Sequence, residues 1–380
     1  MTQITRRTAL TLFAASGLCA PIQVAYAQEA EGRKTIFIIL RGAMDGLAAL
    51  IPDDPAIGGL RKFTLPDTSD RLDLQNGFRL HPSLSGLHGL YQDGDVGFVH
   101  AAATPYRERS HFDGQDFLET LGNASSGDGW LNRVVQAAGG SGLAVGYALP
   151  LALRGDGQVT NWSPPVFDGV SDDLLNRLQN LYADQPVLSE PLAVARATQV
   201  QSVSMSGQRR GGPAGQYLVA SKALGQLMAA DGGPDIGMLS FEGWDTHANQ
   251  AGQLSTRLGG LDAALIGLKN ELGEHWGRTA VVICSEFGRT AGENGTRGTD
   301  HGTGGLMILA GGAIRGGAVY GDWPGLNTRD LYEGRDLAPA NEVVAVLKSI
   351  LEDHVGISRE TLDTRVFDGK SGRINGLIRV

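Results

Sequence analysis

Val281-Val282-Ile283-Cys284-Ser285-Glu286-Phe287-Gly288-Arg289-Thr290 is the stretch of this chain that says most about its fold. Its first four residues are apolar and mostly β-branched, which is typical of a buried strand, and the apolar run gives way to the carboxylate Glu286. Open α/β folds bind their ligands outside the carboxyl ends of their strands. The stretch therefore predicts an α/β fold with Glu286 at the ligand-binding edge of its sheet.

Asp245 and His247 form a second candidate pair, in the segment Gly243-Trp244-Asp245-Thr246-His247. Side chains two positions apart on an extended backbone share a face, so this carboxylate and this imidazole could hold one divalent ion. The alternative is that Asp245 caps the helix that follows and that His247 forms only a local hydrogen bond. The other acidic and histidine motifs of the chain favour the metal site.

Two further glycine-flanked motifs could complete that site. Asp45 follows the apolar run 34–40, which we expect to be a central strand, so it should lie at the same edge as Glu286. Asp300 and His301 lie in a glycine-rich loop that could bring the imidazole to the strand ends, and an ordinary exposed turn is the alternative. The expected metal ligands are Asp45, Asp245, His247, Glu286, Asp300 and His301.

Strand-like and helix-like segments alternate along most of the chain. Residues 96–101 and 305–310 resemble strands, and helices are expected from Ser110 to about Leu121 and over 341–351. Six leucines alternate steps of four and three, as on one face of a helix that packs on a sheet: Leu254, Leu258, Leu261, Leu265, Leu268 and Leu272. We expect a three-layer α/β/α sandwich with a mostly parallel sheet, in a single domain over 28–380.

The segment from about residue 122 to residue 213 differs from the rest in composition. It is rich in glycine, proline and polar residues, with helical patterns at 171–182 and from 190 onward. We therefore expect it to be an insertion in the domain.

The first residues have the organisation of an export signal. Arg6 and Arg7 precede an apolar stretch over 11–20, and Ala25-Tyr26-Ala27 follows it, so we expect a signal peptide over 1–27. The paired arginines favour twin-arginine export, and the ordinary secretory route is the alternative. The apolar stretch is too short to span a bilayer and no later segment could do so, which predicts a periplasmic or secreted mature chain without a transmembrane segment.

Charge and cysteine content argue against a nucleic-acid-binding protein and against a protein stabilised by an intramolecular disulfide. Loss of Arg6 and Arg7 with the leader moves the formal net charge from −9 to −11, which argues against a nucleic-acid partner. Cys19 would leave with the leader, so Cys284 would have no intramolecular disulfide partner. An acidic protein that handles an anionic substrate needs local positive charge, and a bound cation would supply it.

Ser110 is the candidate nucleophile, because it lies at an expected helix start and near the motifs that could hold a cation. A plain helix cap is the alternative for this serine. Nearby cationic and imidazole groups could act on a phosphate-like or sulfate-like anion. We expect catalytic roles for Arg41 and Arg289, and substrate binding by Arg107, Arg109 and His111, with a role as metal ligand or acid as the alternative for His111.

Five motifs in this order resemble an exported bacterial family, the domain of unknown function 1501, from about Arg33 to the C-terminus. They are Leu40-Arg41-Gly42-Ala43-Met44-Asp45-Gly46, Arg109-Ser110-His111-Phe112, Gly243-Trp244-Asp245-Thr246-His247, Ser285-Glu286-Phe287-Gly288-Arg289-Thr290 and Thr299-Asp300-His301-Gly302. The resemblance implies an alkaline-phosphatase-like fold, because that family is grouped with the alkaline phosphatase and sulfatase superfamily. By resemblance, the metal and nucleophile positions of that superfamily are Asp45, Ser110, Asp245, His247 and His301.

The chain departs from the superfamily pattern at Glu286 and Phe287, where phosphatases usually have adjacent aspartate and histidine. Phenylalanine cannot bind a cation, so a two-zinc centre of the phosphatase kind is in doubt unless Asp300 or His301 replaces the missing imidazole. With oxygen ligands in the majority, Mn²⁺, Mg²⁺ and Ca²⁺ fit as well as Zn²⁺. One ion, two ions and none all stay open.

Two functions from different classes follow. The leading one is a metal-dependent hydrolase that acts on a small anionic phosphate or sulfate ester, with Ser110 as the attacking group. The alternative is a non-catalytic member of the fold that binds a ligand or an envelope component. Before export, its partner would be the twin-arginine or secretory machinery.

Overall fold

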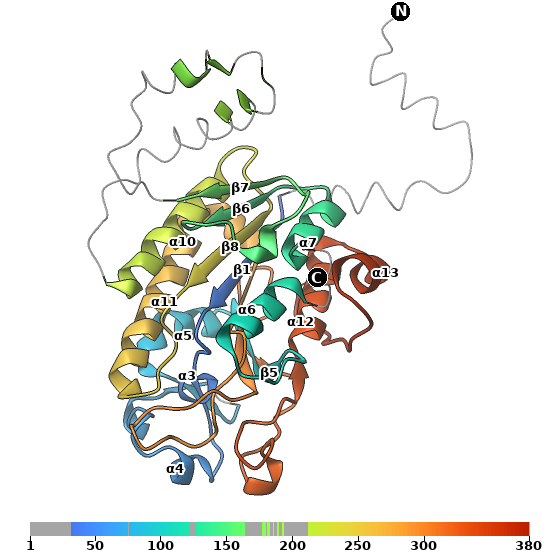
Figure 1. Cartoon of the computed structure of the whole chain (residues 1–380). Helices are drawn as coiled ribbons and strands as arrows, with labels where there is room; N and C mark the ends of the chain where they lie inside the picture. Colours follow the sequence, from blue (N-terminus) through green and yellow to red (C-terminus); the bar gives the residue numbers. More distant parts are fainter. Residues whose placement is uncertain are drawn as a thin grey trace, which may run out of the picture. The chain divides into compact units, whose positions relative to one another are not determined.

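A mixed nine-stranded sheet lies at the centre of the described part of the chain (Figure 1). The computed structural model describes residues 32–74, 76–121, 127–163 and 212–379, and a few positions between 177 and 193. From Arg33 onward the chain forms one compact unit. The expected export signal over 1–27 lies outside the described residues, as do most of the helical patterns expected at 171–182 and after 190.

The strands of the main sheet follow the order β11-β5-β10-β9-β1-β8-β6-β7, and β12 pairs with β5. Neighbours are parallel except where β10 pairs with β5 and with β9. Both β1 and β10 have the expected bounds. The strands are β1 (Lys34–Leu40), β5 (Val96–Ala103), β6 (Gly142–Val145), β7 (Val159–Trp162), β8 (Ile236–Phe241), β9 (Thr279–Cys284), β10 (Gly305–Ala310), β11 (Val319–Tyr320) and β12 (Asn341–Glu342).

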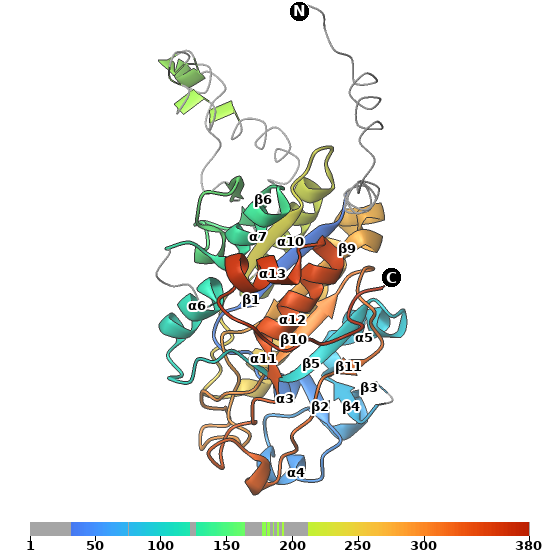
Figure 2. The same cartoon turned by 90° about the vertical axis from the view of Figure 1, so that its right-hand side faces the viewer.

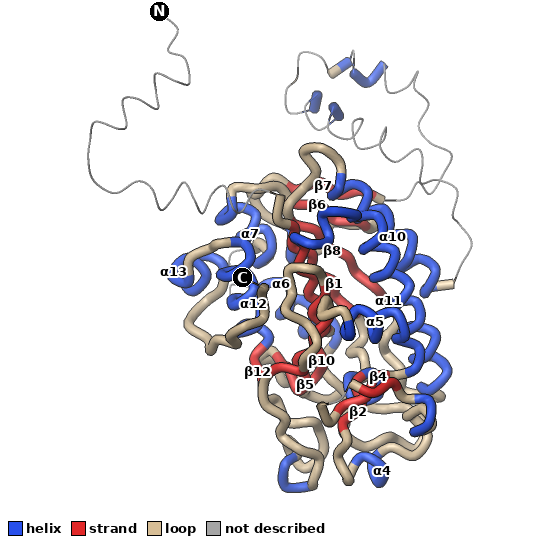
Figure 3. The backbone as a smooth tube through the Cα atoms, turned by 180° about the vertical axis from the view of Figure 1, so that it is seen from behind, coloured by secondary structure: helices blue, strands red, loops and turns tan. Residues whose placement is uncertain are grey.

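Helices cover both faces of this sheet, as Figures 1 and 2 show. One face packs against α5, α10 and α11, which lie together in the view from behind (Figure 3). The other face packs against α6, α7 and α12. The expected three-layer α/β/α sandwich with a mostly parallel sheet is confirmed. The helices are α3 (Gly46–Ala49), α4 (Ile57–Leu60), α5 (Ser85–Gln92), α6 (His111–Thr120), α7 (Trp130–Ala138), α10 (Pro213–Ala229), α11 (Gln250–Leu272), α12 (Val343–Ile350) and α13 (Arg359–Thr361).

Strand β1 is buried on both sides, and its alternating side chains serve two separate cores. Ile36, Ile38 and Leu40 belong to the core under α10 and α11, whereas Phe37 and Ile39 belong to the core under α6, α7 and α12. This follows from the two-residue period of a strand. The six leucines of α11 are all buried in the first core, as their spacing predicts. The two cores hold the sheet in place, and with it the ends of its strands.

The segment expected to be an insertion contributes in part to the main sheet. Strands β6 and β7 both lie within 122–213, and β6 pairs in parallel with β8. The expectation that this segment stands apart from the core therefore fails for residues 127–163. The sequence did not predict β6 and β7, because each strand is only four residues long and both lie in a segment rich in glycine and polar residues.

A smaller three-stranded sheet packs near one end of the first core. It consists of β2 (Leu50–Pro52), β4 (Phe78–Leu80) and β3 (Leu72–Asp73), all antiparallel. The closing segment expected as one helix over 341–351 begins as β12, continues as α12, and ends in a π-helical turn, Leu351–Val355. Over the described residues, every helix is too short or too polar to cross a membrane.

Two buried histidines should make the fold sensitive to acid. Burial lowers the pKa of His100 and of His354 to about 4. In the unfolded chain a histidine titrates near its ordinary value, roughly 6.5. The unfolded state therefore binds more protons between these two values, so stability is complete above the higher value and falls as the pH drops towards the lower one.

When the pH falls from 7 to 5, we expect each of these histidines to lower the unfolding free energy by on the order of 2 kcal/mol. Urea unfolding at the two pH values measures this change. The His100→Gln variant, whose amide can still donate to the Leu50 carbonyl, should lose one histidine's share of the pH dependence. An equal pH dependence in this variant and the unmodified chain would contradict the assignment.

Candidate metal centre

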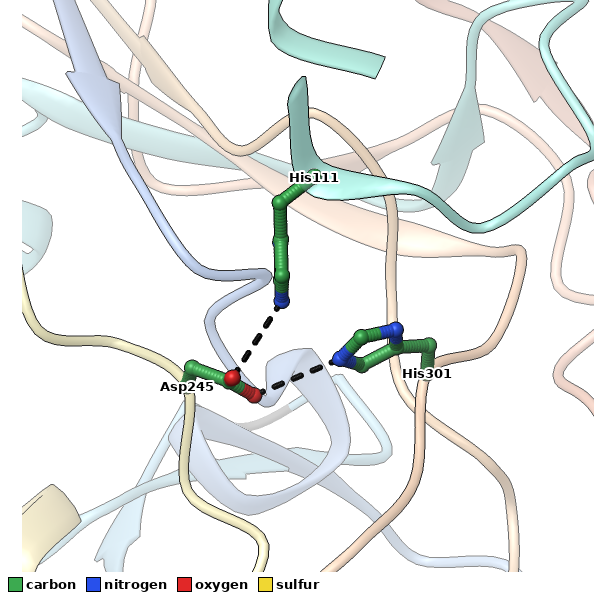
Figure 4. A group of neighbouring side chains, drawn as sticks. All are labelled: His111, Asp245 and His301. Atoms are coloured by element: carbon green, nitrogen blue, oxygen red, sulfur yellow. Dashed lines mark ion pairs between the residues drawn. The ribbon is translucent and has the colours of Figure 1, made fainter. Parts of the chain in front are cut away.

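His111, Asp245 and His301 bring their side-chain ligand atoms together at the carboxyl ends of the strands (Figure 4). His111 opens α6, Asp245 follows β8, and His301 lies in the loop before β10. Their ligand atoms all lie within 4.8 Å of one another. His111 Nε2 is 3.4 Å from Asp245 Oδ2, and His301 Nε2 is 3.4 Å from Asp245 Oδ1. Segments that are far apart along the chain therefore meet at one point.

His247 adds a third imidazole to this group. Its Nε2 atom is 3.0 Å from Asp245 Oδ1 and 2.9 Å from His301 Nε2. The expected pairing of Asp245 with His247 on one side of the backbone therefore occurs. Together His111, Asp245, His247 and His301 form what we call the histidine–aspartate centre.

Each imidazole of the histidine–aspartate centre has an acceptor at its other nitrogen. His111 Nδ1 lies 2.7 Å from Glu286 Oε1, and His301 Nδ1 lies 2.9 Å from the Arg109 carbonyl oxygen. His247 Nδ1 lies 3.3 Å from Asp300 Oδ1. A carbonyl or carboxylate can only accept, so each Nδ1 atom carries a proton, and in the neutral form of each imidazole the Nε2 atom then offers a lone pair. This is how metal-binding histidines are usually oriented.

A positive charge between the Nε2 atoms would stabilise this arrangement. Two lone pairs 2.9 Å apart, on His247 and His301, repel unless a cation or an added proton lies near them. His111 Nε2 is buried and has no hydrogen-bond partner among the described residues. A buried polar atom without a partner is costly, and a bound cation would remove that cost. The residues thus fit a divalent metal.

The buried guanidinium of Arg289 fixes Asp245. Its Nη2 atom donates to Asp245 Oδ1 over 2.6 Å, and its remaining donors reach the backbone carbonyls of Gly42, Ala43, Trp244 and Thr299. Burial raises the pKa of Asp245, but the hydrogen bond and charge of Arg289 outweigh it, so this pKa is lowered. Arg289 keeps the carboxylate ionised, and its own side chain is fully buried.

Phe287 lies flat against His111. The two rings stack with centroids 5.0 Å apart and planes 24° apart, and Phe287 also contacts His301. Gly114 on α6 permits this approach, since a Cβ atom there would lie 3.1 Å from the Phe287 ring. The residue that breaks the superfamily pattern therefore supports the centre by packing against its imidazoles.

Asp45 has a different role from the expected one. It is buried, accepts from Arg61 Nη1 over 2.5 Å and from Gln250 Nε2 over 2.5 Å, and caps α3 through Ala48 N. These bonds outweigh burial, which alone would raise its pKa, so the pKa of Asp45 is lowered. The structure groups this carboxylate with Arg61 and not with the histidine–aspartate centre.

Glu286 and Asp300 also act one step away from the centre, since each accepts from the Nδ1 atom of a histidine. Of the six expected metal ligands, the structure therefore brings three into the centre directly: Asp245, His247 and His301. His111, which we expected to bind substrate, joins them. No second ligand-type residue lies near His111 at a metal-binding spacing in the sequence. The residues that surround His111 in the structure come from three other segments.

Ser110 caps α6, and its Oγ accepts from Asp113 N at 3.5 Å. Ser110 directly precedes His111 in the chain, and its backbone N donates to Tyr106 Oη over 3.0 Å. The arginines expected to bind an anion are engaged. Arg41 pairs with Glu119, Arg109 pairs with Asp336 and Glu333, and Arg107 donates to the carbonyls of Thr104 and Tyr106.

His301 and His111 differ in how strongly they hold a proton. Burial is the main cause that lowers the pKa of His301, which favours its neutral form. The hydrogen bond to Glu286 is the main cause that raises the pKa of His111. A metal must displace the proton from this imidazole, so acid should weaken binding.

The chain belongs to the DUF1501 family of proteins of unknown function. That family model matches residues 98–363, which is more than half of the chain and includes every residue of the histidine–aspartate centre. The expected family membership is therefore confirmed. The comparison with curated protein sequences found no match.

Solved structures with a similar fold include a periplasmic domain, a sulfatase and an alkaline phosphatase. One is the zinc complex of the C-terminal periplasmic domain of EcEptC from Escherichia coli, with 9% identity and a TM-score of 0.43 over 92% of this chain and 93% of that one. Another is the PsFucS1 sulfatase from Pseudoalteromonas sp., with 11% identity and a TM-score of 0.40 over 94% and 75%. A third is the alkaline phosphatase from the Antarctic bacterium TAB5, with 13% identity and a TM-score of 0.34 over 73% and 91%. These values are low, and the similarity is one of fold alone.

The buried Asp45–Arg61 pair yields a test that separates it from the histidine–aspartate centre. Asp45→Ala leaves the Arg61 charge buried without its partner, which should lower the unfolding free energy by about 3 kcal/mol. Chemical denaturation measures this loss. The metal content of the folded variant should equal that of the unmodified chain, and its loss from folded protein would restore Asp45 as a ligand.

Proposed function

We propose that the chain is an exported, metal-dependent hydrolase that acts on a phosphate or sulfate ester, with its cation held by the histidine–aspartate centre. The observation that carries this proposal is the set of three imidazoles whose Nδ1 atoms all have acceptors and whose Nε2 atoms converge on Asp245. Export through the leader at 1–27 is part of the proposal, and it is motivated by Arg6, Arg7 and the apolar stretch that follows.

The donor set favours a metal that accepts nitrogen ligands. Three imidazoles and one carboxylate suit Zn²⁺ or Mn²⁺ better than Mg²⁺ or Ca²⁺, which prefer oxygen ligands throughout. This differs from the sequence-based expectation of an oxygen majority, because Asp45, Glu286 and Asp300 are engaged elsewhere. When bound, such an ion would act as a Lewis acid that stabilises negative charge on an ester oxygen.

The residues of the chain would divide the remaining work. Arg289 holds Asp245 ionised, and Glu286 holds His111 in the tautomer that offers Nε2. Ser110 is the proposed nucleophile, because it directly precedes His111 and because the start of α6 would favour a negative charge on its oxygen. Phe287 excludes water from one face of His111.

One observation favours a non-catalytic alternative. The four arginines expected to orient an anion all have partners, and Arg41, Arg109 and Arg289 are paired with carboxylates. A site of this kind could bind a ligand or envelope component through its metal without turnover. Metal content without any hydrolysis would favour it.

Metal content tests the centre before any substrate is known. Mature protein produced with its own leader should contain roughly one divalent transition-metal ion per chain by elemental analysis. His301→Ala should lose most of it, whereas His88→Ala, a change on α5, should not. Metal-free unmodified protein, or full retention by His301→Ala, would contradict the proposed centre.

Hydrolysis of aryl phosphates and aryl sulfates tests the reaction. Ser110→Ala should lower kcat by at least about a hundredfold, and a chelator should abolish turnover. Ser358→Ala is the matched control, because Ser358 caps α13 in the same way without lying near the centre. Activity that persists in Ser110→Ala and also in the presence of the chelator would contradict this mechanism.

A further inference from the structure

One face of α6 carries a row of polar residues that begins at the histidine–aspartate centre. His111, Gln115 and Glu119 are spaced four residues apart, so they lie on the same side of the helix. Gln115 Nε2 donates to Glu286 Oε1 over 3.0 Å, and Arg41 Nη1 donates to Gln115 Oε1 over 2.8 Å. Glu119 Oε1 accepts from Arg41 Nη2 over 2.6 Å. The row connects α6 to the loops after β1 and β9.

The amide of Gln115 can face only one way in this row. Arg41 has donors and no acceptor, so it requires the carbonyl oxygen of Gln115. The Gln115 NH₂ group must then point at Glu286 Oε1, which accepts from it over 3.0 Å. Arg41, which has only donors, thereby fixes the orientation of an uncharged neighbour.

Glu286 Oε1 is held by three donors. Gly42 N lies at 2.9 Å, Gln115 Nε2 at 3.0 Å and His111 Nδ1 at 2.7 Å, and the Glu286 side chain is fully buried. The Gly42 amide is part of the backbone and cannot turn. Apart from His111 itself, Gln115 is thus the side chain among these three donors, and its removal leaves the Gly42 amide to hold Glu286 against His111. A carboxylate held by fewer donors should keep the proton of His111 on Nδ1 less firmly.

We infer that Gln115 is a positioning residue, which holds Glu286 in place so that His111 keeps its proton on Nδ1 and presents Nε2 to the cation. The inference rests on the proposed metal centre for its functional meaning. It also assigns Arg41 a role other than anion binding, since this arginine orients the Gln115 amide. The polar partners of Gln115 and Arg41 all lie outside the histidine–aspartate centre.

Two variants of Gln115 and a matched control test this role. Gln115→Leu removes both hydrogen bonds with little change in size. Gln115→Glu keeps an acceptor for Arg41 but places a second carboxylate beside Glu286. Gln226→Leu is the control, because Gln226 also donates from a helix to a glutamate, Glu271, over 2.7 Å and lies outside the row.

The first measurement is metal affinity, by competition with a chromophoric chelator. Mutation of groups that support metal ligands typically costs 10–100-fold in affinity, so we expect a loss of about tenfold for Gln115→Leu and a larger one for Gln115→Glu. The Gln226→Leu control should bind as tightly as the unmodified chain. Unchanged affinity in both Gln115 variants would overturn the inference.

The second measurement needs no metal. In metal-free protein, the His111 Nδ1 proton, shielded by Glu286, should give a low-field ¹H NMR signal that is absent from His111→Gln. Gln115→Leu should shift or broaden this signal, and Gln226→Leu should leave it in place. A signal that stays unchanged in Gln115→Leu would overturn the positioning role, even if the unmodified chain binds metal. If the chain binds no metal but the signal responds as expected, the proposed function fails while the link from Gln115 to His111 stands.

Discussion

One buried guanidinium holds the loops of this centre together. Arg289 follows β9, and its donors reach the loop after β1 at Gly42 and Ala43, the loop after β8 at Trp244 and Asp245, and the loop before β10 at Thr299. Four of its five contacts are to backbone carbonyls, whose positions depend on the parallel pairing of β8, β1 and β9. The fold and the histidine–aspartate centre therefore depend on the same group, because without it three loops would lose their common partner.

The sequence predicted the framework well because strand and helix periods are local properties. The run 34–40 and the leucine series of α11 could be placed from their apolar spacing alone, and both appear as expected. Strands β6 and β7 were missed because four-residue strands carry little periodic signal and lie in a glycine-rich segment. Short strands of this kind are recognised only when their partner is known, and β8 is far along the chain from β6.

The location of the candidate site could be predicted from the sequence, but the contacts of each carboxylate within it could not. Carboxylates at strand ends were found correctly, yet a sequence cannot show whether a carboxylate faces a cation or a neighbouring side chain. Asp45 faces Arg61, a residue that carried no motif, and Glu286 faces His111. The four-residue spacing of His111, Gln115 and Glu119 was the one local signal that pointed to a shared polar face on α6, and it is visible in the sequence.

Glu286 and Phe287, adjacent in the loop after β9, act together on His111. Phenylalanine at 287 removes an imidazole from the loop after β9, and the same ring stacks on the imidazole that α6 supplies. Glu286 then accepts from that imidazole, so two adjacent residues fix His111 by stacking and by hydrogen bonding. The loop after β9 therefore supports an imidazole that comes from another element, α6.

The central claim is that imidazole nitrogens surround a cation at this edge of the sheet. The most direct test is X-ray absorption spectroscopy of the purified chain, measured at the absorption edge of the metal that it contains. We predict a first shell with imidazole nitrogen in the majority, and a smaller imidazole contribution in His111→Ala. A shell made only of oxygen, or one that His111→Ala leaves unchanged, would contradict the account.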